Sequence, residues 1–174
     1  RVLFRSYGCT YPNAKLVRFD PETDAMEDLG RMHPTEMYSR TVTTGADGFV
    51  YTTVGTAKAD IVAFDPKTGN AASVFDSPPN VAPGVFPGLW KTEDGSVYGS
   101  IQSKNYRLNE GKAAETASPG AAAPLKLRDG RIVSAYSEGS FTLTDPNTGR
   151  QTKRQFKYAG AGDIDRKSTR LNSS

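Results

Sequence analysis

One short stretch of the chain, residues 30–40, concentrates side chains suited to acid–base chemistry. It contains the single histidine, His33, and places Tyr38 two positions before Arg40. Residues two apart on a β-strand point to the same face, so we expect the phenol and the guanidinium to lie side by side. This trio suits β-elimination from a uronic acid. Arginine would neutralise the substrate carboxylate and acidify the proton on the adjacent carbon, which tyrosine or histidine would then remove.

A second interpretation gives the same residues a structural role. In it, His33 and Arg40 hydrogen-bond loop carbonyls, and Tyr38 packs between neighbouring sheets. The two interpretations differ in geometry, because catalysis requires the three side chains to converge within hydrogen-bond reach of one substrate.

Other side chains offer less chemistry. Trp90, Tyr106 and Tyr136 either form a stacking platform for sugar rings or belong to the core, as aromatic residues between sheets commonly do. Cys9 has no second cysteine to pair with, so no disulfide or thiolate metal cluster is expected within the chain. The sequence shows no recognisable metal-binding motif, and it does not indicate a cofactor.

Two kinds of turn alternate along the sequence and indicate a repeated unit. The first begins with Asp-Pro, and the second is Asp-Gly followed by one variable and two apolar residues. The Asp-Pro turns lie at 20–24, 65–69 and 145–149, with a shortened form at 109–112, and the Asp-Gly turns lie at 47–51, 94–98 and 129–133. The Asp-Gly turns are spaced by 47 and then 35 residues, which brackets the ~40 to 45 residues of a four-stranded propeller blade.

The runs between these turns are short and rich in β-branched and aromatic residues, which favours strands. Asp-Gly between such runs predicts a hairpin with a primed turn, since glycine adopts the positive φ required. We therefore assign Asp47, Asp94 and Asp129 to turns rather than to a Ca²⁺ site. The sequence predicts an all-β fold, a β-propeller fragment of about three and a half four-stranded antiparallel blades in an open arc. The expected blades are about 15–29 (partial), 41–75, 89–117 and 124–156.

Two segments, VYTTVG at 50–55 and DIVAFDPKTG at 60–69, resemble known repeats. Their order is similar to that of quinoprotein-like, NHL and SMP-30-like propellers, in which a strand, a loop and a strand ending in Asp-x-x-Thr-Gly recur. The Trp that follows Thr-Gly in quinoprotein repeats and the Trp-Asp dipeptide of WD40-like repeats are both absent. The resemblance covers most of 15–156 and implies a fold, not a function. Propeller polysaccharide lyases are similar in using His, Tyr and Arg, but no motif carries their residues over.

Both ends of the chain are expected to be foreign to the fold. Residues 1–6 and 165–174 can each be written in codons as part of a sequencing-library adapter, so we expect neither tail to be structural. The remaining body, 7–164, holds 17 Lys and Arg against 18 Asp and Glu, a formal charge of −1 instead of the +3 of the whole chain. Its basic residues form no stripe, which argues against nucleic acid as a partner. No apolar run approaches the ~20 residues of a membrane span.

The meander geometry places function at one end of the sheets. Both turn types fall at one end, and the remaining connections, which are longer and more varied, fall at the other. Binding residues are expected in these varied loops. The loops are 30–40, 55–60, 77–87, 102–105 and 118–123.

Two functional classes follow from these observations. In the first, the chain is a fragment of a larger bacterial protein whose propeller binds a small-molecule, carbohydrate or protein ligand on the long-loop rim. In the alternative, it is a propeller-type polysaccharide lyase or hydrolase that acts on an acidic sugar polymer by β-elimination. Composition and repeat style favour an extracellular or periplasmic protein. Open blade edges are expected to make the fragment self-associate.

Overall fold

The computed structural model describes residues 6–127, 129–137 and 140–155, and these residues are all-β. No helix long and apolar enough to cross a membrane occurs among them. The chain divides into two compact units, Arg1–Ala123 and Pro124–Ser174. Of the two expected tails, only Ser6 lies within the described residues.

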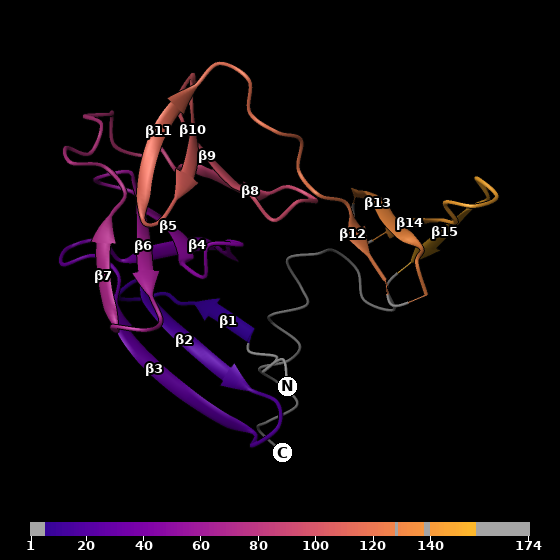
Figure 1. Cartoon of the computed structure of the whole chain (residues 1–174), viewed down its shortest axis with the longest axis horizontal. Helices are drawn as coiled ribbons and strands as arrows, with labels where there is room; N and C mark the ends of the chain where they lie inside the picture. The colour runs from indigo at the N-terminus through magenta and orange to yellow at the C-terminus, as the bar shows by residue number, and fades with distance from the viewer. Residues whose placement is uncertain (1–5, 128, 138–139, 156–174) are drawn as a thin grey trace. The chain divides into compact units, whose positions relative to one another are not determined.

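The described strands form four antiparallel sheets, and each sheet is a meander in which strands adjacent in the chain are adjacent in the sheet (Figure 1). Sheet 1 contains β1 (Ser6–Cys9), β2 (Lys15–Asp20) and β3 (Ala25–Arg31), and sheet 2 contains β4 (Tyr38–Thr44), β5 (Val50–Gly55), β6 (Asp60–Asp65) and β7 (Asn70–Ser73). Sheet 3 contains β8 (Gly88–Lys91), β9 (Val97–Ile101), β10 (Lys104–Asn109) and β11 (Lys112–Thr116), and sheet 4 contains β12 (Leu125–Lys126), β13 (Ile132–Ser137), β14 (Ser140–Thr144) and β15 (Gln151–Gln155).

The predicted all-β architecture of repeated antiparallel blades is confirmed. Each four-stranded sheet places an Asp-Gly turn between its first and second strands, and an Asp-Pro turn or its shortened form between its third and fourth. Sheet 1 differs from the expectation of two strands, because a third strand, β1, begins at Ser6 and pairs with β2. The first unit holds sheets 1 to 3, and the second holds sheet 4.

The Asp-Pro turns are shaped by their own first residue, whose carboxylate accepts a hydrogen bond from the amide two positions on. Gly69 and Gly149 close two of these turns with φ of 76° and 68°, and Asp24 takes the same left-handed position with φ of 55°. The bonds of 2.8 to 2.9 Å join Asp20 to Glu22, Asp65 to Lys67 and Asp145 to Asn147.

The Asp-Gly turns differ in type from the predicted primed turns. The Gly48 amide donates to the Gly45 carbonyl at 3.1 Å, so the glycine is the fourth residue of the turn, with φ of 89°. This is a type I turn followed by a left-handed glycine, the three-residue form of hairpin loop. The Asp47 carboxylate favours this form because it accepts the Phe49 amide at 3.0 Å. The same bonding recurs in the turns that end at Gly95 and Gly130.

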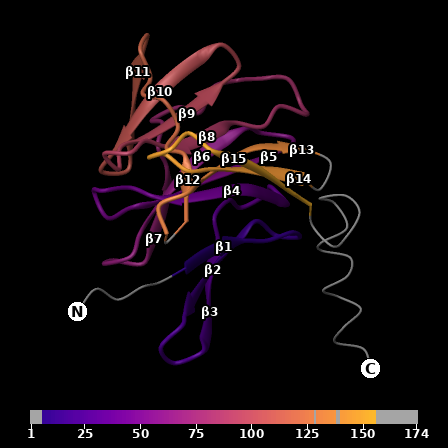
Figure 2. The same cartoon turned by 90° about the vertical axis from the view of Figure 1, so that its right-hand side faces the viewer.

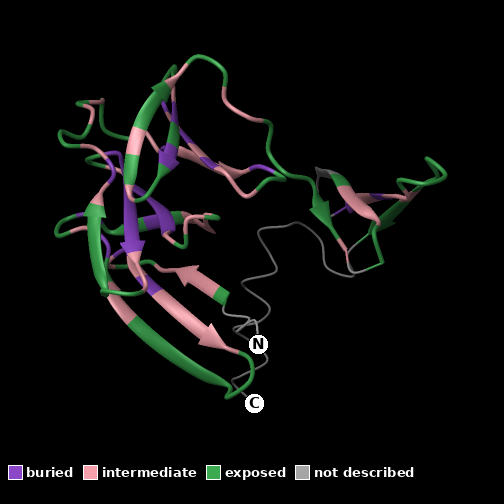
Figure 3. Ribbon diagram, viewed as in Figure 1, coloured by how far each residue is buried: buried purple, intermediate pink, exposed green. Residues whose placement is uncertain are grey.

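Sheet 2 forms the centre of the first unit, where the three sheets follow one another in chain order (Figure 2). All of β5 is buried, as is most of β6 (Figure 3). On one face Phe64 shares a cluster with Leu16 of sheet 1, and on the other Ala63 shares a cluster with Leu108 of sheet 3. We call the face directed toward the previous sheet in the chain the preceding face, and the opposite one the following face.

Turns of sheets 2 and 3 are hydrogen-bonded to each other at one end of the unit, which we call the turn rim. The Asp47 carboxylate accepts the Glu110 amide at 2.8 Å and the Tyr51 hydroxyl at 2.5 Å. That hydroxyl in turn accepts the Gly111 amide at 3.2 Å. Burial, together with the bond to Asp47, raises the pKa of Tyr51 above its usual range. Both turn types therefore lie at the same end of the sheets, as the meander predicts.

Candidate ligand-binding site on the loop rim

Three loops of the first unit are joined at the opposite end, which we call the loop rim: residues 30–40, 55–60 and 77–87. Glu36, only 3% exposed, ties the first loop to the second. Its carboxylate accepts the backbone amides of Ala57 at 3.0 Å and Lys58 at 2.8 Å. The third loop is attached through the Gly84 amide, which donates to the Thr56 carbonyl at 2.8 Å. The rim is thus a connected surface rather than a set of independent loops.

An aromatic cluster lies on this rim. The rings of Tyr11 and Tyr38 are stacked with their centroids 4.4 Å apart, although both remain exposed, at 61% and 41%. Phe86 meets Tyr38 edge-on at 6.3 Å, and the guanidinium carbon of Arg40 lies 4.8 Å from the centre of the Phe86 ring. The phenol and the guanidinium predicted to share a face of β4 therefore meet around one phenylalanine from another loop.

The charges of this cluster follow from its contacts. A hydrogen bond with the Tyr11 hydroxyl raises the pKa of Tyr38, so the phenol stays protonated near neutral pH and acts as a donor or acceptor. Arg40 is exposed and takes part in none of the ion pairs found among the described residues. Its face is held by the Phe86 ring, which leaves the edge of the guanidinium fork available to an anion.

His33 is used within its own loop. Its Nδ1 accepts the amides of Thr35 at 3.2 Å and Glu36 at 3.0 Å, an arrangement that requires the tautomer with its proton on Nε2. The structure therefore brings Tyr38 and Arg40 together around Phe86, while the hydrogen bonds of His33 in the described part of the chain stay within residues 33–36.

A buried carboxylate, Asp60, stands at the start of β6 on the same side of the unit. It is 3% exposed, and its Oδ1 accepts the Ile61 amide at 2.7 Å and the Ser73 hydroxyl at 2.9 Å. Burial raises the pKa of Asp60, while these two hydrogen bonds and the charge that His33 can carry oppose that effect. The carboxylate is accommodated by the fold and is not directed to solvent.

A shallow depression of about 290 Å³ adjoins the second and third loops of the rim. Backbone and side chains of residues 57–59 form one wall, and residues 78–81 form the other. Lys58 supplies the charged group of this lining, and Pro78 and Pro79 supply rigid apolar surface. The size matches the lower end of ligand pockets.

Of the aromatic residues that could belong either to a sugar platform or to the core, Trp90 and Tyr106 lie outside this cluster. Tyr106 is 7% exposed and packs edge-on against Phe75 in the core between sheets 2 and 3. Trp90 stacks on Tyr98 and donates its indole N–H to the Gly120 carbonyl at 2.8 Å. The side chain of Tyr136 lies outside the described residues.

Cys9 and a possible metal site are the remaining points raised by the sequence. Cys9 is a half-buried free thiol in β1. Among the described residues, no three His, Cys, Asp or Glu side chains gather closely enough to hold a metal ion.

Sequence reasoning missed three residues that build the rim. Tyr11 and Phe86 complete the aromatic cluster, and Glu36 ties two loops together. Tyr11 and Phe86 are 75 positions apart in proline-containing loops, so no periodicity connects them. Glu36 was visible only as one charged residue within the 30–40 stretch, because its function depends on amides supplied by another loop.

Comparison with known proteins leaves the family open. No family model matches the chain, and no curated protein matches it. Among solved structures, it is similar to the crystal structure of TolB from Acinetobacter baumannii, with a TM-score of 0.40 and 15% identity. The likeness covers 82% of this chain and 38% of that one, so the chain spans well under half of that protein. The assignment to an all-β array of propeller-type blades rests on the four meanders themselves.

Proposed function

We propose that the chain is a propeller scaffold whose loop rim binds a carbohydrate that carries carboxylate groups. The observation that supports this function is the exposed stack of Tyr11 on Tyr38 beside Arg40. One face of a sugar ring presents C–H groups that pack on aromatic rings, while its edge presents hydroxyl and carboxylate groups that need donors. The stack would receive the ring face, and the guanidinium would receive the carboxylate.

The side chains of the aromatic cluster are preorganised for binding. Phe86 supports both Tyr38 and Arg40, so their side chains lose less conformational freedom on binding than free surface side chains would. Glu36 holds Ala57 and Lys58, which form part of one wall of the nearby depression. An oligosaccharide anchored on the tyrosines therefore has further apolar and basic surface on the same rim.

Elimination by a polysaccharide lyase is the second candidate function. The exposed Tyr38 and the Arg40 side chain, which forms no ion pair with described residues, favour it. Two observations favour binding without catalysis instead. The pKa of Tyr38 is raised, and Nδ1 of His33 is engaged by loop amides. Catalysis by His33 would require it to act through Nε2, because its Nδ1 is engaged by the loop amides.

The proposed ligand also bears on location. Acidic polysaccharides are polymers of cell envelopes and extracellular matrices, so with such a ligand we expect the protein in the periplasm or outside the cell. The expectation from composition was the same.

Calorimetric titration with a uronic acid oligomer and with its neutral counterpart tests the binding proposal. Tyr38→Ala should weaken binding of the oligomer about tenfold or more, which corresponds to about 1.4 kcal/mol. Tyr38→Phe should leave it nearly unchanged, because the ring is retained. Arg40→Gln should abolish the preference for the acidic oligomer, while Arg107→Gln, an exposed arginine of β10, should not.

Equal weakening by Arg40→Gln and Arg107→Gln would contradict the site, as would unmeasurable binding of every acidic oligosaccharide by the unmutated chain. The same samples test catalysis through the absorbance of the unsaturated uronate product. If that product forms and Tyr38→Phe abolishes it while binding persists, the rim is a lyase site rather than a binding site alone.

A further inference from the structure

In the described part of the first unit, no sheet packs on the preceding face of sheet 1. The three sheets of the first unit can be aligned on Asp20, Asp65 and Asn109, which end β2, β6 and β10 and start equivalent turns. Two apolar positions of these strands then recur on the preceding face. In sheets 2 and 3 these positions are at most 7% exposed, whereas in sheet 1 they are only half-buried. The aligned pairs are Val62 and Phe64, Tyr106 and Leu108, and Val17 and Phe19.

The neighbouring strand adds apolar surface to the same face. Met26 of β3 is the register partner of Phe19 and is 67% exposed. Cross-strand partners point to the same side of a sheet, so the methionine extends the apolar patch formed by Val17 and Phe19. Next to it, the turn of residues 20–24 carries Asp20, Glu22 and Asp24 and no basic residue. We call this patch with its turn the acidic face.

The last sheet shows the opposite character on its following face. Leu143 of β14 takes the place that Ala63 has in sheet 2, where the following face packs on the next sheet. By the same registers, Arg131 stands where Phe49 does, and Arg154 stands where Val74 does. Positions that are apolar in a covered interface are thus occupied by arginine in sheet 4.

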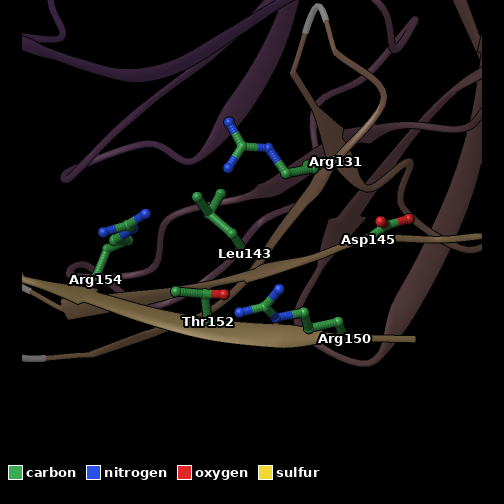
Figure 4. Close-up of a pocket in the computed structure, with 6 residues that line it drawn as sticks. All are labelled: Arg131, Leu143, Asp145, Arg150, Thr152 and Arg154. Carbon is green, nitrogen blue, oxygen red and sulfur yellow. The ribbon is translucent and has the colours of Figure 1, made fainter. Parts of the chain in front are cut away.

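These side chains line a depression of about 330 Å³ within the second unit, with Leu143 between Arg131 and Arg154 (Figure 4). Arg150 and Asp145 complete its charged lining. Arg131 is paired with Asp129 at 2.5 Å, and no ion pair among the described residues engages Arg150 or Arg154. We call this surface the arginine face.

The interface between sheets 2 and 3 shows how such faces meet. There, the Asp-Gly turn of one sheet contacts the turn after the third strand of the next, through the bond from the Glu110 amide to Asp47. If the arginine face met the acidic face in the same way, Arg131, which follows the Asp-Gly turn of sheet 4, would meet the turn of residues 20–24. Leu143 would meet Phe19 and Met26. The two faces are therefore complementary in charge and in apolar content.

We propose that the arginine face of one copy of this chain binds the acidic face of a second copy. The contact is heterologous, since different surfaces of the two copies meet, and its occupant is a partner sheet rather than a small molecule. Attraction between arginines and carboxylates orients the pair, while burial of Leu143 against Phe19 and Met26 supplies the apolar contact.

Sedimentation velocity of the full chain over a range of concentrations tests the proposal. Association should be concentration-dependent and weaken about tenfold or more between about 0.01 M and about 1 M salt, because the screening length falls from about 30 to about 3 Å. A monomer at every concentration would overturn the proposal. The proposal would also be overturned if the chain stayed monomeric and bound inorganic phosphate, and if Arg154→Gln abolished that phosphate binding. The pocket would then be a site for a free anion.

Charge reversal identifies the surfaces. Arg131→Glu with Arg154→Glu should abolish self-association, as should Glu22→Lys with Asp24→Lys. Mixing the two double variants should restore association between them, because the unchanged arginine face of the second variant attracts the unchanged acidic face of the first. Combining all four changes in one chain should restore association, since the charges are exchanged. Lys153→Glu, the same charge change on the opposite face of β15, should leave association unaltered.

Failure of the fourfold variant to associate, or an effect of Lys153→Glu equal to that of Arg154→Glu, would overturn the proposed surfaces. Circular dichroism checks that every variant keeps its β-sheet signal. Arg154→Glu alone carries the test if the change at Arg131 disturbs the turn that it forms with Asp129.

Discussion

The carboxylate of Asp47 accepts the backbone amide of Glu110 at 2.8 Å across 63 positions of sequence. The same carboxylate caps the amide of Phe49 in its own turn and accepts the Tyr51 hydroxyl. Asp47, whose place in the sequence indicates only a turn, therefore also joins two sheets.

The contribution of this link is measurable by comparison with Asp94, whose carboxylate accepts hydrogen bonds from Thr92 and Ser96 of its own turn in the described part of the chain. Asp47→Ala should lower the free energy of unfolding by about 1 to 2 kcal/mol more than Asp94→Ala does. Each change removes three hydrogen bonds, but those of Asp47 include one from the buried Tyr51 and one from Glu110 in the turn of another sheet. Denaturant titration of the two variants measures the difference. Equal losses would show that the link between the sheets contributes nothing.

Gly55 should control the position of Phe86. A Cβ at this glycine would lie 3.1 Å from the Val85 carbonyl oxygen and 3.3 Å from the Phe86 ring. Gly55→Ala should therefore displace the ring that supports Tyr38, and change the near-ultraviolet dichroism of the aromatic residues while the far-ultraviolet spectrum is kept. Thr56→Ala is the matched control and should leave both spectra unaltered. An unchanged near-ultraviolet spectrum in Gly55→Ala would contradict the close packing.

Glu36 should determine the order of the second rim loop. Glu36→Ala removes the acceptor of the Ala57 and Lys58 amides, so hydrogen exchange at these two positions should accelerate about tenfold or more, as loss of about 1.4 kcal/mol implies. Glu115→Ala, which removes an exposed partner of Lys104, should leave exchange in that loop unaltered. Protection that persists in Glu36→Ala would mean that other contacts hold the loop.

Asp60 should make stability depend on pH. Its pKa is raised in the folded chain, so the folded state holds the proton more tightly than the unfolded state does. The resulting stabilisation is complete below the unfolded pKa and is lost as pH rises through the folded pKa. Asp60→Asn keeps an acceptor for Ile61 and Ser73 but cannot ionise. The free energy of unfolding of this variant should therefore decrease less as pH rises, and it should exceed that of the parent at neutral pH. Thermal unfolding from about pH 3.5 upward checks the slope, and a variant less stable than the parent at neutral pH would contradict it.

Much of the fold could be read from local sequence. Residues such as Asp65 and Gly69 specify a turn through their own side chain and backbone, so the alternation of two turn types predicted the order of strands and the meander. The same local reasoning erred on the form of the Asp-Gly turn. The dipeptide is compatible with two hairpin loops, and the bond from Phe49 to Asp47 selects the longer one.

The site depended on distance in space. Spacing alone could place Tyr38 beside Arg40 on one strand, because alternation is a property of any β-strand. That Tyr11 and Phe86 would join them, and that the hydrogen bonds of His33 would stay within its own loop, was decided by how separate loops meet at the end of the sheets. Such contacts depend on packing between segments far apart in the chain, which no local pattern encodes, whereas turns and strand order depend on neighbouring residues and are written in the sequence itself.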